Sequence, residues 1–339
     1  MRPRLRGWRA YVNWIRSNYE LWRRTAHIGA RPLKINVDPT NACQLRCALC
    51  PTGLHLHDRE TGHASRELFE RLLEEIGDYV FFLDFFNWGE PLLHPHVEEL
   101  IPLAAERGIV CRLSTNLSLP LADKRVHRLV TSGLDESIVS LDGASTETYL
   151  RYRRQGDFNQ VCENMRRIVT EKNRLGRSKP LVTWQFLVFR HNEHEKDRAL
   201  ALAEEIGVDT LAFRAPLVEV ERYPLPAADC DPAAWTPSDP LFQIAPTPPP
   251  SPAASPKPCA WHYMSSAVNW DGGVAPCCTL YEKGDDFGSL GPHGGRSYMD
   301  IQNNSVYRAI RDRFAGRRRE PANLVCERCP TPSIQNLDR

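Results

Sequence analysis

The sequence has 339 residues, of which 42% are hydrophobic and 25% are charged, and its formal net charge is +1. This length allows one large domain and a smaller one with a sizeable buried core. The balanced charge argues against nucleic acid or a membrane as partners, and no apolar run reaches the ~18 residues of a membrane-spanning helix. The N-terminus lacks the apolar core of a signal peptide, so we expect a cytoplasmic protein.

The first segment, residues 1–32, is basic and amphipathic. Its first 31 residues contain eight arginines and one glutamate, and aromatic and basic residues alternate at helical spacing. The simplest interpretation is a helical extension whose apolar side packs against the rest of the protein. That side comprises Trp8, Val12, Ile15 and Tyr19. Binding to a membrane surface is an alternative that such a helix leaves open.

Six predicted strands and five predicted helices alternate between residues 33 and 215. The strands are 33–37, 79–86, 109–114, 136–141, 181–189 and 209–214, and the helices are 65–76, 94–107, 121–131, 145–173 and 193–206. This alternation is typical of an α/β fold with βα units around a parallel sheet. About 180 residues are too few for an eight-unit barrel, so an open, partial barrel of six units fits better. In such folds the functional residues lie at the carboxyl ends of the strands.

Three cysteines follow the first predicted strand in the pattern C-x3-C-x2-C: Cys43, Cys47 and Cys50. The chain has eleven cysteines, and an odd number without a secretory signal favours metal binding over disulfides. Three thiolates can hold three irons of a four-iron cluster and leave the fourth iron open to a cofactor or substrate. Zinc remains an alternative from spacing alone, because His55, His57 or His63 could supply its fourth ligand.

A proline-rich segment and a second group of cysteines follow the sixth strand. We interpret residues 216–258 as a linker or insertion, because residues 224–258 contain twelve prolines and cannot belong to the core. The C-terminal region, 259–339, contains five cysteines, a turn at 270–273 and a predicted helix at 304–315. Its cysteine pattern, C-x12-G-x4-C and then C-x2-C, suits an iron–sulfur cluster or zinc equally well.

The first cysteine motif and the strand ends that follow it resemble the radical S-adenosylmethionine (SAM) enzyme family. The resemblance implies a partial (β/α)6 barrel over residues 33–215 and a [4Fe–4S] cluster whose open iron binds SAM. Reductive cleavage of SAM in this family gives a 5′-deoxyadenosyl radical that abstracts a hydrogen atom from the substrate. One departure is Leu49, where the family usually has an aromatic residue before the third cysteine.

The resemblance also implies a set of residues that bind SAM. "NWGEP" (87–91) is similar to the segment that receives the SAM ammonium, through Gly89 and Glu90, although Trp88 replaces the family's first glycine. Arg153 is the candidate partner of the SAM carboxylate, because a guanidinium can bind a carboxylate bidentately. The remaining implied contacts are Ser114 and Asn116 in "LSTN", Ser140 and Asp142 in "VSLDG", and Gln185 on the fifth strand.

The C-terminal cysteines resemble the auxiliary-cluster module of many radical SAM enzymes, called SPASM in its long form and twitch in its short form. The resemblance implies Cys259, Cys277, Cys326 and Cys329 as ligands of an auxiliary [4Fe–4S] cluster. Because no cysteine follows Cys329, we expect the twitch form. Cys278 is then a small buried hydrophobe or a hydrogen-atom donor to the substrate radical. The other three cysteines, Cys111, Cys162 and Cys230, are expected to have no chemical role.

The resemblance implies an enzyme that acts on a small polar substrate, such as a sugar or aminocyclitol of a natural-product pathway. An electron donor such as flavodoxin or ferredoxin is the expected protein partner. Transfer of an electron to the auxiliary cluster would give dehydrogenation, and return of hydrogen from Cys278 would give epimerisation. The alternative is a maturase of ribosomally made peptides, although the 32 residues before the first strand are too few for a peptide-recognition domain. A non-enzymatic zinc or redox scaffold would leave Glu90, Asp142 and Arg153 without a role.

Overall fold

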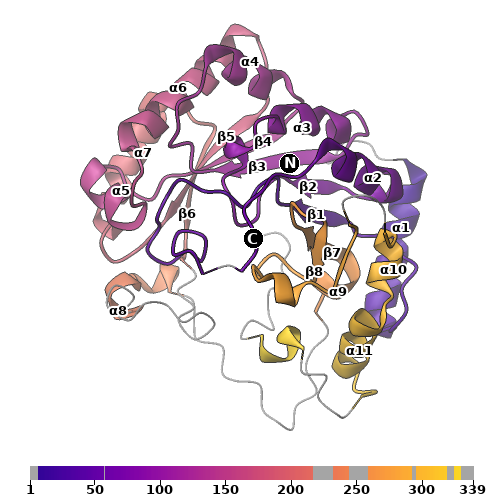
Figure 1. Ribbon diagram of the computed structural model, residues 1–339. Coiled ribbons are helices and arrows are strands. Elements are labelled where there is room, and N and C mark those ends of the chain that lie inside the picture. The colour runs from indigo at the N-terminus through magenta and orange to yellow at the C-terminus, as the bar shows by residue number, and fades with distance from the viewer. Residues whose placement is uncertain are drawn as a thin grey trace.

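The computed structural model describes residues 7–56, 58–216, 232–243, 259–291, 295–318 and 324–329. In this part of the chain the strands form one continuous nine-stranded sheet in the order β6-β5-β4-β3-β2-β1-β7-β8-β9 (Figure 1). The first six strands, all parallel, are β1 (Lys34–Val37), β2 (Phe82–Asp84), β3 (Val110–Thr115), β4 (Glu136–Ser140), β5 (Leu181–Leu187) and β6 (Thr210–Arg214). This arrangement confirms the expected α/β partial barrel of six units.

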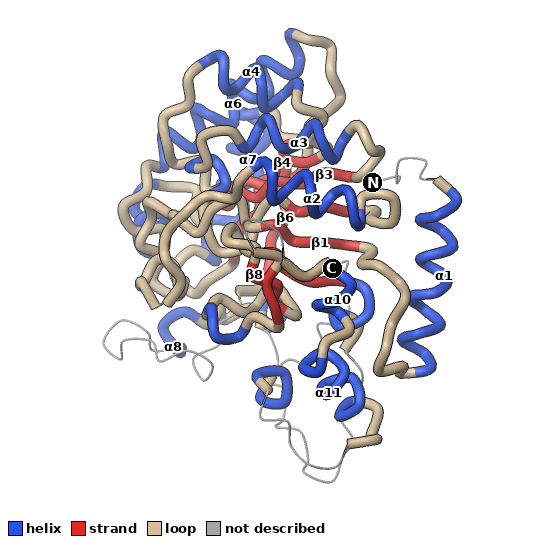
Figure 2. The backbone as a smooth tube through the Cα atoms, turned by 45° about the vertical axis from the view of Figure 1, so that its right-hand side comes forward, coloured by secondary structure: helices blue, strands red, loops and turns tan. Residues whose placement is uncertain are grey.

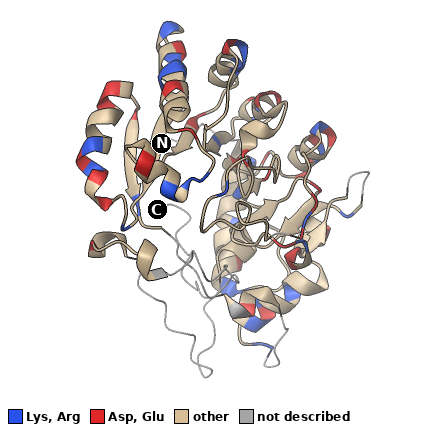
Figure 3. Cartoon of the chain, turned by 60° about the vertical axis from the view of Figure 1, so that its left-hand side comes forward, with Lys and Arg blue, Asp and Glu red and all other residues tan. Residues whose placement is uncertain are grey.

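The helices that connect these strands lie outside the curved sheet (Figure 1). They are α2 (Arg66–Ile76), α3 (Val97–Ala105), α4 (Asp123–Thr131), α5 (Thr146–Tyr152), α6 (Phe158–Arg174) and α7 (Lys196–Ile206). Alternate strand residues such as Leu83, Leu113 and Trp184 are fully buried in the core that contains the residues of these helices. Basic and acidic residues are interspersed along the outer helices (Figure 3), as the balanced net charge would suggest.

The segment 145–173, predicted as one helix, is two helices separated at residues 153–157. Gln155 has a positive φ of 65°, which few side chains favour, and this ends the helical backbone. Gly156 has no room for a side chain, because a Cβ there would lie 2.4 Å from the Tyr149 hydroxyl. The break places Arg153 at the C-cap of α5.

The C-terminal region extends the barrel sheet. β7 (Ser265–Val268) pairs in parallel with β1, and β8 (Gly273–Ala275) and β9 (Gly288–Ser289) follow in antiparallel order. Three helices accompany these strands: α9 (Trp261–Met264), α10 (Tyr298–Gln302) and α11 (Ser305–Phe314). The expected turn at 270–273 joins β7 to β8, with Gly272 at a φ of 84° that suits glycine.

Part of the proline-rich segment is packed, contrary to the expectation that none of it could join a core. Within it lie α8 (Pro232–Trp235) and the short 3-10 helix η3 (Pro240–Phe242). Trp235 is buried against Tyr152 and Phe189, in the same cluster as Leu45 of the first cysteine motif. The large aromatic side chain therefore outweighs the poor hydrogen-bonding capacity of its proline-rich surroundings. The rest of the expected linker, with Cys230, lies outside the described residues.

The N-terminal helix, α1 (Trp8–Arg23), is present but faces the opposite way from the simplest interpretation. The side chains of Trp8, Val12, Ile15 and Tyr19, expected to be buried, are 53–72% exposed. The inner face instead carries Ala10, Asn13, Ser17 and Glu20. The neighbouring segment 29–31 offers backbone polar groups rather than apolar surface, so polar side chains are favoured there. No helix in the described residues is long and apolar enough to cross a membrane.

Candidate active site

The first three cysteines lie on the loop that follows β1, at the carboxyl end of the parallel strands. Burial raises the pKa of both Cys43 and Cys47 to about 12, and the neighbouring thiols of the motif add to the effect. These thiols therefore stay protonated unless a cation stabilises their thiolate forms. None of the described cysteines forms a disulfide.

Two segments hold this loop by backbone hydrogen bonds on either side. On one side, the amide of Glu90 donates to the carbonyl of Ala42 at 2.8 Å. On the other, the amide of Ala48 donates to the carbonyl of Tyr152 at 3.2 Å, and that of Arg46 donates to Arg154 at 2.9 Å. The break between α5 and α6 therefore supports the cysteine loop directly.

Gly89 allows the segment after β2 to approach the cysteine loop. A Cβ at this position would lie 1.7 Å from the carbonyl oxygen of Thr40, so no side chain fits without separating the two segments. The Gly89 amide also donates to Asp38 Oδ1 at 3.4 Å. The sequence singled out Gly89 through its resemblance to a SAM-binding segment, and the structure adds that its small size is a packing requirement.

Glu90 is buried and linked to the end of β3. Its carboxylate accepts hydrogen bonds from the hydroxyl of Thr115 at 2.6 Å and from the backbone amides of Asn116 at 2.7 Å and Leu92 at 3.0 Å. Burial is the largest effect on its pKa and raises it, while these donors oppose the shift. A carboxylate has about four acceptor sites, so one remains for a further donor.

Asn116 connects β3 to the first cysteine. Its Nδ2 lies 3.7 Å from Cys43 Sγ, and its Oδ1 accepts from Gln44 Nε2 at 2.8 Å. Ser114, two residues earlier, is half-buried on the strand face opposite the buried Leu113. Ser140 and Gln185 lie side by side in the β4–β5 register. All four therefore lie on the carboxyl halves of the barrel strands or directly after them.

Arg153 and Asp142 form a buried ion pair next to the cysteine loop. Arg153 Nε donates to Asp142 Oδ2 at 2.6 Å, and its Nη1 lies 4.0 Å from Cys47 Sγ. The other carboxylate oxygen of Asp142 accepts from the amide of Leu187 at 2.7 Å. Burial raises the pKa of Asp142, and the Arg153 charge acts against that shift. Both Asp142 oxygens are thus already engaged by groups of the protein.

A second buried charge group lines the interior of the barrel. Asp84 on β2 binds Lys34 Nζ at 2.9 Å and accepts from both Nε and Nη2 of Arg112, at 2.7 and 2.9 Å. Asp84 has no exposed surface, whereas the two basic side chains are 15% and 21% exposed. The sequence analysis did not identify these residues. The signal was present as one charged residue inside each of three otherwise apolar strands.

The C-terminal cysteines gather beside β7. Burial raises the pKa of Cys259 to about 12, with further contributions from Cys277 and Cys329, so these three thiols are neighbours. Cys326 Sγ lies 3.4 Å from Nε2 of His262. Burial lowers the pKa of His262 to about 3. A neutral imidazole can donate its N–H to sulfur, so His262 suits a supporting role at this group.

Cys278 lies near the charge group of the barrel. Burial raises its pKa to about 12, and the charges of Lys34 and Asp84 also act on it. The thiol therefore adjoins both the C-terminal cysteine group, through Cys277, and the charge group of the barrel.

The two cysteine groups supply the thiolate donors that iron–sulfur clusters require. Among the described residues, no three His, Cys, Asp or Glu side chains converge as ligands of one ion. A four-iron cluster places each cysteine on a separate iron, so its ligands lie farther apart than those of tetrahedral zinc. Each of the two groups consists of cysteines whose thiols affect one another electrostatically and are therefore neighbours. His57, one of the alternative zinc ligands, lies outside the described residues.

Trp88 joins the barrel to the C-terminal region. Its indole Nε1 donates to the carbonyl of Leu280 at 2.8 Å. Its ring contacts the Tyr281 ring edge-on, with 5.6 Å between the ring centroids. The carbonyl of Trp88 accepts from the Thr52 hydroxyl in the cysteine loop at 2.9 Å. The residue that departs from the family pattern thus links the two cysteine regions.

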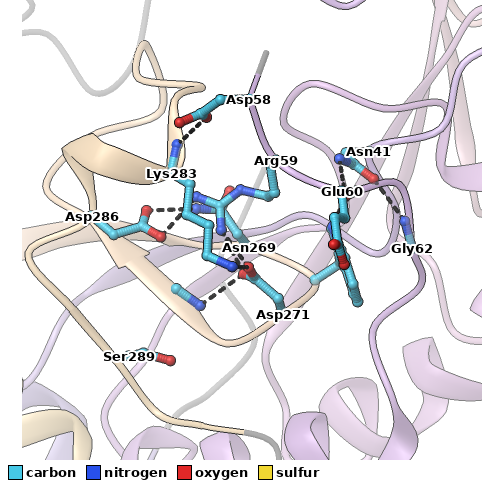
Figure 4. Close-up of polar contacts among 12 residues, drawn as sticks. Asn41, Asp58, Arg59, Glu60, Gly62, Asn269, Asp271, Lys283, Asp286 and Ser289 are labelled. Carbon is cyan, nitrogen blue, oxygen red and sulfur yellow. Dashed lines mark hydrogen bonds and ion pairs between the residues drawn. The ribbon is translucent and has the colours of Figure 1, made fainter.

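An ion-pair network makes a second connection between the two regions (Figure 4). Arg59 follows the cysteine loop and reaches Asp271 at 2.6 Å and Asp286 at 2.7 Å in the β7–β9 region. The backbone amide of Lys283 adds a hydrogen bond to Asp58 Oδ1 at 2.7 Å. Burial raises the pKa of Asp286 to about 6, against the effect of the Arg59 charge. The first cysteine loop is therefore fastened to the C-terminal region at two places.

Comparison with known proteins agrees with this geometry. The radical SAM superfamily profile matches residues 37–205, and the profile of the SPASM iron–sulfur cluster-binding domain matches residues 259–330. Streptococcus suis SuiB bound to S-adenosylmethionine has a similar fold, with a TM-score of 0.58 and 16% identity over 88% of this chain and 72% of that one.

Two curated relatives match the chain in part. The tungsten-containing aldehyde ferredoxin oxidoreductase cofactor-modifying protein of Pyrococcus furiosus is 25% identical over 51% of this chain. The PqqA peptide cyclase of Granulibacter bethesdensis is 25% identical over 57% of this chain. The chain spans about half the length of these relatives, 48% in each case. The protein is therefore a radical SAM superfamily enzyme with a C-terminal SPASM domain, and its cofactors are [4Fe–4S] clusters and SAM.

Proposed function

We propose that this enzyme abstracts a hydrogen atom from a peptide substrate held inside the barrel. The observation that carries the reaction class is the convergence of Cys43, Glu90 and Arg153 at the carboxyl end of the strands. The peptide class is supported by the similarity to a PqqA peptide cyclase and by the similar fold of Streptococcus suis SuiB, which has also been solved bound to precursor peptide SuiA.

Different residues around the first cysteine loop are proposed to bind different groups of SAM. When bound, the cluster and SAM supply the adenosyl radical. Glu90 has one acceptor site left for the SAM ammonium, and the guanidinium of Arg153, which Asp142 holds through Nε, suits the SAM carboxylate. Asp142 acts through Arg153, because both of its oxygens are engaged by the protein. Ser114, Ser140 and Gln185 remain for the ribose and the adjacent substrate.

The charge group of the barrel interior suits a polar substrate. Lys34 and Arg112 share one carboxylate, that of Asp84, so two cationic side chains meet a single anionic one in this group. Glu136, half-buried on β4, accepts from the hydroxyl of Thr183 at 2.7 Å and adds an acceptor. Donors and acceptors on neighbouring strands of the barrel can satisfy the backbone amides and polar side chains of a peptide.

Cys278 is proposed to control the fate of the substrate radical. If its S–H returns a hydrogen atom to the opposite face of the radical carbon, the product is an epimer. The resulting sulfur radical must then be restored by one electron and one proton from the electron donor. If Cys278 returns no hydrogen, the substrate radical would have to give one electron to the auxiliary cluster held by the C-terminal cysteines and one proton to solvent. The product would then have two hydrogens fewer than the substrate.

A sugar or aminocyclitol is the second candidate substrate. The observation in its favour is the closeness of Cys278 to the Lys34–Asp84 pair, which could hold a hydroxyl-bearing carbon near the thiol. Both substrate classes need the same residues for SAM, so the geometry of the first site does not separate them.

The test uses the full chain, reconstituted with iron and sulfide without oxygen and given SAM and a chemical reductant. Synthetic peptides for the short reading frames beside its gene are compared with a panel of sugars and aminocyclitols. We expect a peptide to raise 5′-deoxyadenosine formation and to lose two hydrogens or gain deuterium from heavy water. Stimulation by a sugar alone would overturn the peptide proposal, and cleavage of SAM that no substrate stimulates would also count against it.

Two cysteine variants separate the role of Cys278 from a packing effect. Cys278→Ala should abolish deuterium uptake while substrate-dependent 5′-deoxyadenosine formation continues. Cys111→Ala removes another buried thiol, on β3, and should leave both readouts unchanged. Equal deuterium uptake in the Cys278 variant and the parent enzyme would exclude Cys278 as the hydrogen donor.

A further inference from the structure

Helix α1 presents a continuous apolar face to solvent. Seven large apolar side chains of this 16-residue helix are 43–73% exposed: Trp8, Tyr11, Val12, Trp14, Ile15, Tyr19 and Trp22. At 100° per residue they cover one side of the helix, opposite the buried face. The helix lies at the outer edge of the molecule (Figure 2). Exposure of so many aromatic residues on one element marks an interaction surface.

The outward orientation of this face is fixed by hydrogen bonds on the inner side. Asn13 Nδ2 donates to the carbonyl of Arg31 at 2.9 Å, and the Arg31 amide donates back to Asn13 Oδ1 at 2.8 Å. The carboxylate of Glu20 accepts from the amides of Gly29 at 2.9 Å and Ala30 at 3.1 Å. A rotation that buried the aromatic residues would break all four hydrogen bonds, so the helix does not simply roll inward.

The charges around the apolar face have one sign. Glu20 is the single acidic residue of α1, and it points inward. Arg9, Arg16 and Arg23 recur every seven residues along one flank of the apolar face. Two of these form ion pairs within the protein, Arg9 with Asp78 and Arg16 with Glu20. The flank therefore retains positive charge chiefly near the C-terminal end of the helix.

That end of α1 meets a second basic segment of the sequence, residues 311–318 (RDRFAGRR). Arg317 donates to the carbonyl of Arg24, which places the segment after α11 beside the end of α1. Arg317 itself pairs with Asp312. Within the described residues, no ion pair involves Arg23, Arg24 or Arg318, and all three are exposed. The two basic runs, almost 300 residues apart in sequence, thus form one positive patch next to the aromatic face.

We propose that α1 docks along its length on an anionic phospholipid surface. Trp and Tyr combine an apolar ring with a polar group and favour the interface between headgroups and acyl chains. Arginine binds phosphate with two parallel hydrogen bonds, so the patch of Arg23, Arg24 and Arg318 suits the headgroups. A protein partner usually receives aromatic residues in pockets, whereas this convex ridge, about 24 Å long, matches a deformable flat surface.

This inference revises the expectation of no membrane partner. That expectation rested on the net charge of the whole chain, which is +1. Peripheral binding depends on the charge and apolar area of the contacting face, and acidic residues elsewhere do not neutralise it.

The test is flotation of the full chain with lipid vesicles. We expect it to bind vesicles of phosphatidylglycerol and phosphatidylcholine, to bind weakly to phosphatidylcholine alone, and to be released by high salt. The triple variant Trp8→Ser/Trp14→Ser/Trp22→Ser should lower the partition coefficient about tenfold or more. Arg23→Gln/Arg24→Gln should lower it by about fivefold per arginine.

Matched variants elsewhere on the surface serve as controls. Leu200→Ser, on an exposed position of α7, and Arg66→Gln, on α2, should bind vesicles as the parent does. The triple variant should keep the melting temperature and iron content of the parent, because its changes lie on the outer face. Parent-level vesicle binding by the triple variant would overturn the proposal, as would no binding by the parent. Self-association of the parent, abolished in the triple variant and without vesicle binding, would assign the face to a second copy instead.

Discussion

Arg153 and Asp142 form an ion pair with 2.6 Å between Nε and Oδ2, and the same guanidinium lies 4.0 Å from Cys47 Sγ. The pair joins the end of β4 to the break after α5. Because Asp142 has no exposed surface and binds Arg153 through Nε, it fixes the guanidinium while leaving most of its donors available.

Arg153→Lys should weaken SAM binding without removing the cluster. Lysine keeps the positive charge but loses the planar fork, so the dissociation constant of SAM should rise about tenfold, or about 1.4 kcal/mol. Isothermal titration of the reconstituted enzyme measures this constant, and iron content should stay at the parent level. Arg151→Lys, an exposed neighbour, is the control. An unchanged dissociation constant in Arg153→Lys would remove Arg153 from the SAM site.

Asp142→Asn extends this test to the residue that positions Arg153. If Asp142 acts only through Arg153, the double variant with Arg153→Lys should bind SAM about as weakly as the weaker single variant. Independent contacts with SAM would instead make the two effects on the binding free energy add.

Gly89→Ala should disrupt the first cysteine loop. The added Cβ would lie 1.7 Å from the Thr40 carbonyl, so the segment after β2 and the loop must move apart. We expect the enzyme to hold about half of the parent's iron and to melt at a lower temperature, with a loss of about 1–3 kcal/mol of stability. Gly284→Ala is the matched control, because no atom lies within 4 Å of its Cβ position. Full iron content in Gly89→Ala would contradict the packing argument.

Trp88→Phe should loosen the connection between the barrel and the SPASM domain. Phenylalanine can keep the edge-on contact with Tyr281 but cannot donate to the Leu280 carbonyl. The loss of one hydrogen bond should cost about 1 kcal/mol of stability and speed amide hydrogen exchange near residues 277–281. Trp22→Phe, at a position 73% exposed, should change neither quantity. Exchange at the parent rate in Trp88→Phe would show that the contact carries no stability.

The sequence predicted the barrel and the cysteine loop well because their signals are local. The alternation of apolar strands with helical periods predicted the six strands of the barrel, although the observed β2, Phe82–Asp84, is shorter than the expected 79–86. The cysteine spacing and the strand-end residues such as Glu90 and Asn116 converge in the structure because parallel strands end at one edge.

Features set by contacts distant in sequence could not be predicted in this way. The two sides of α1 could be recognised, but which side faces inward depends on the polar backbone of residues 29–31. Trp88 departs from the family pattern, and its role depends on Leu280, almost 200 residues away. Likewise, the pairing of β7 with β1 follows from no local pattern.

Asp38 should make stability depend on pH between about 4 and 7. Burial raises its pKa from 3.8 to about 7, despite hydrogen bonds from Gly89 and Trp88 and the nearby charge of Arg59. Because the folded state holds this proton more tightly than the unfolded chain, the free energy of unfolding falls as the pH rises through this range. At 1.36 kcal/mol per pH unit, the interval corresponds to about 4 kcal/mol.

Asp38→Asn removes this titration while keeping the size of the side chain. The variant should therefore be more stable than the parent above pH 7, and the difference should vanish below about pH 4, where Asp38 is protonated in both states. Urea unfolding of the reconstituted enzyme across this range gives the two curves. Asp123→Asn, whose carboxylate is fully exposed, should run parallel to the parent. Parallel curves for Asp38→Asn and the parent would mean that Asp38 ionises as freely in the folded protein as in the unfolded chain.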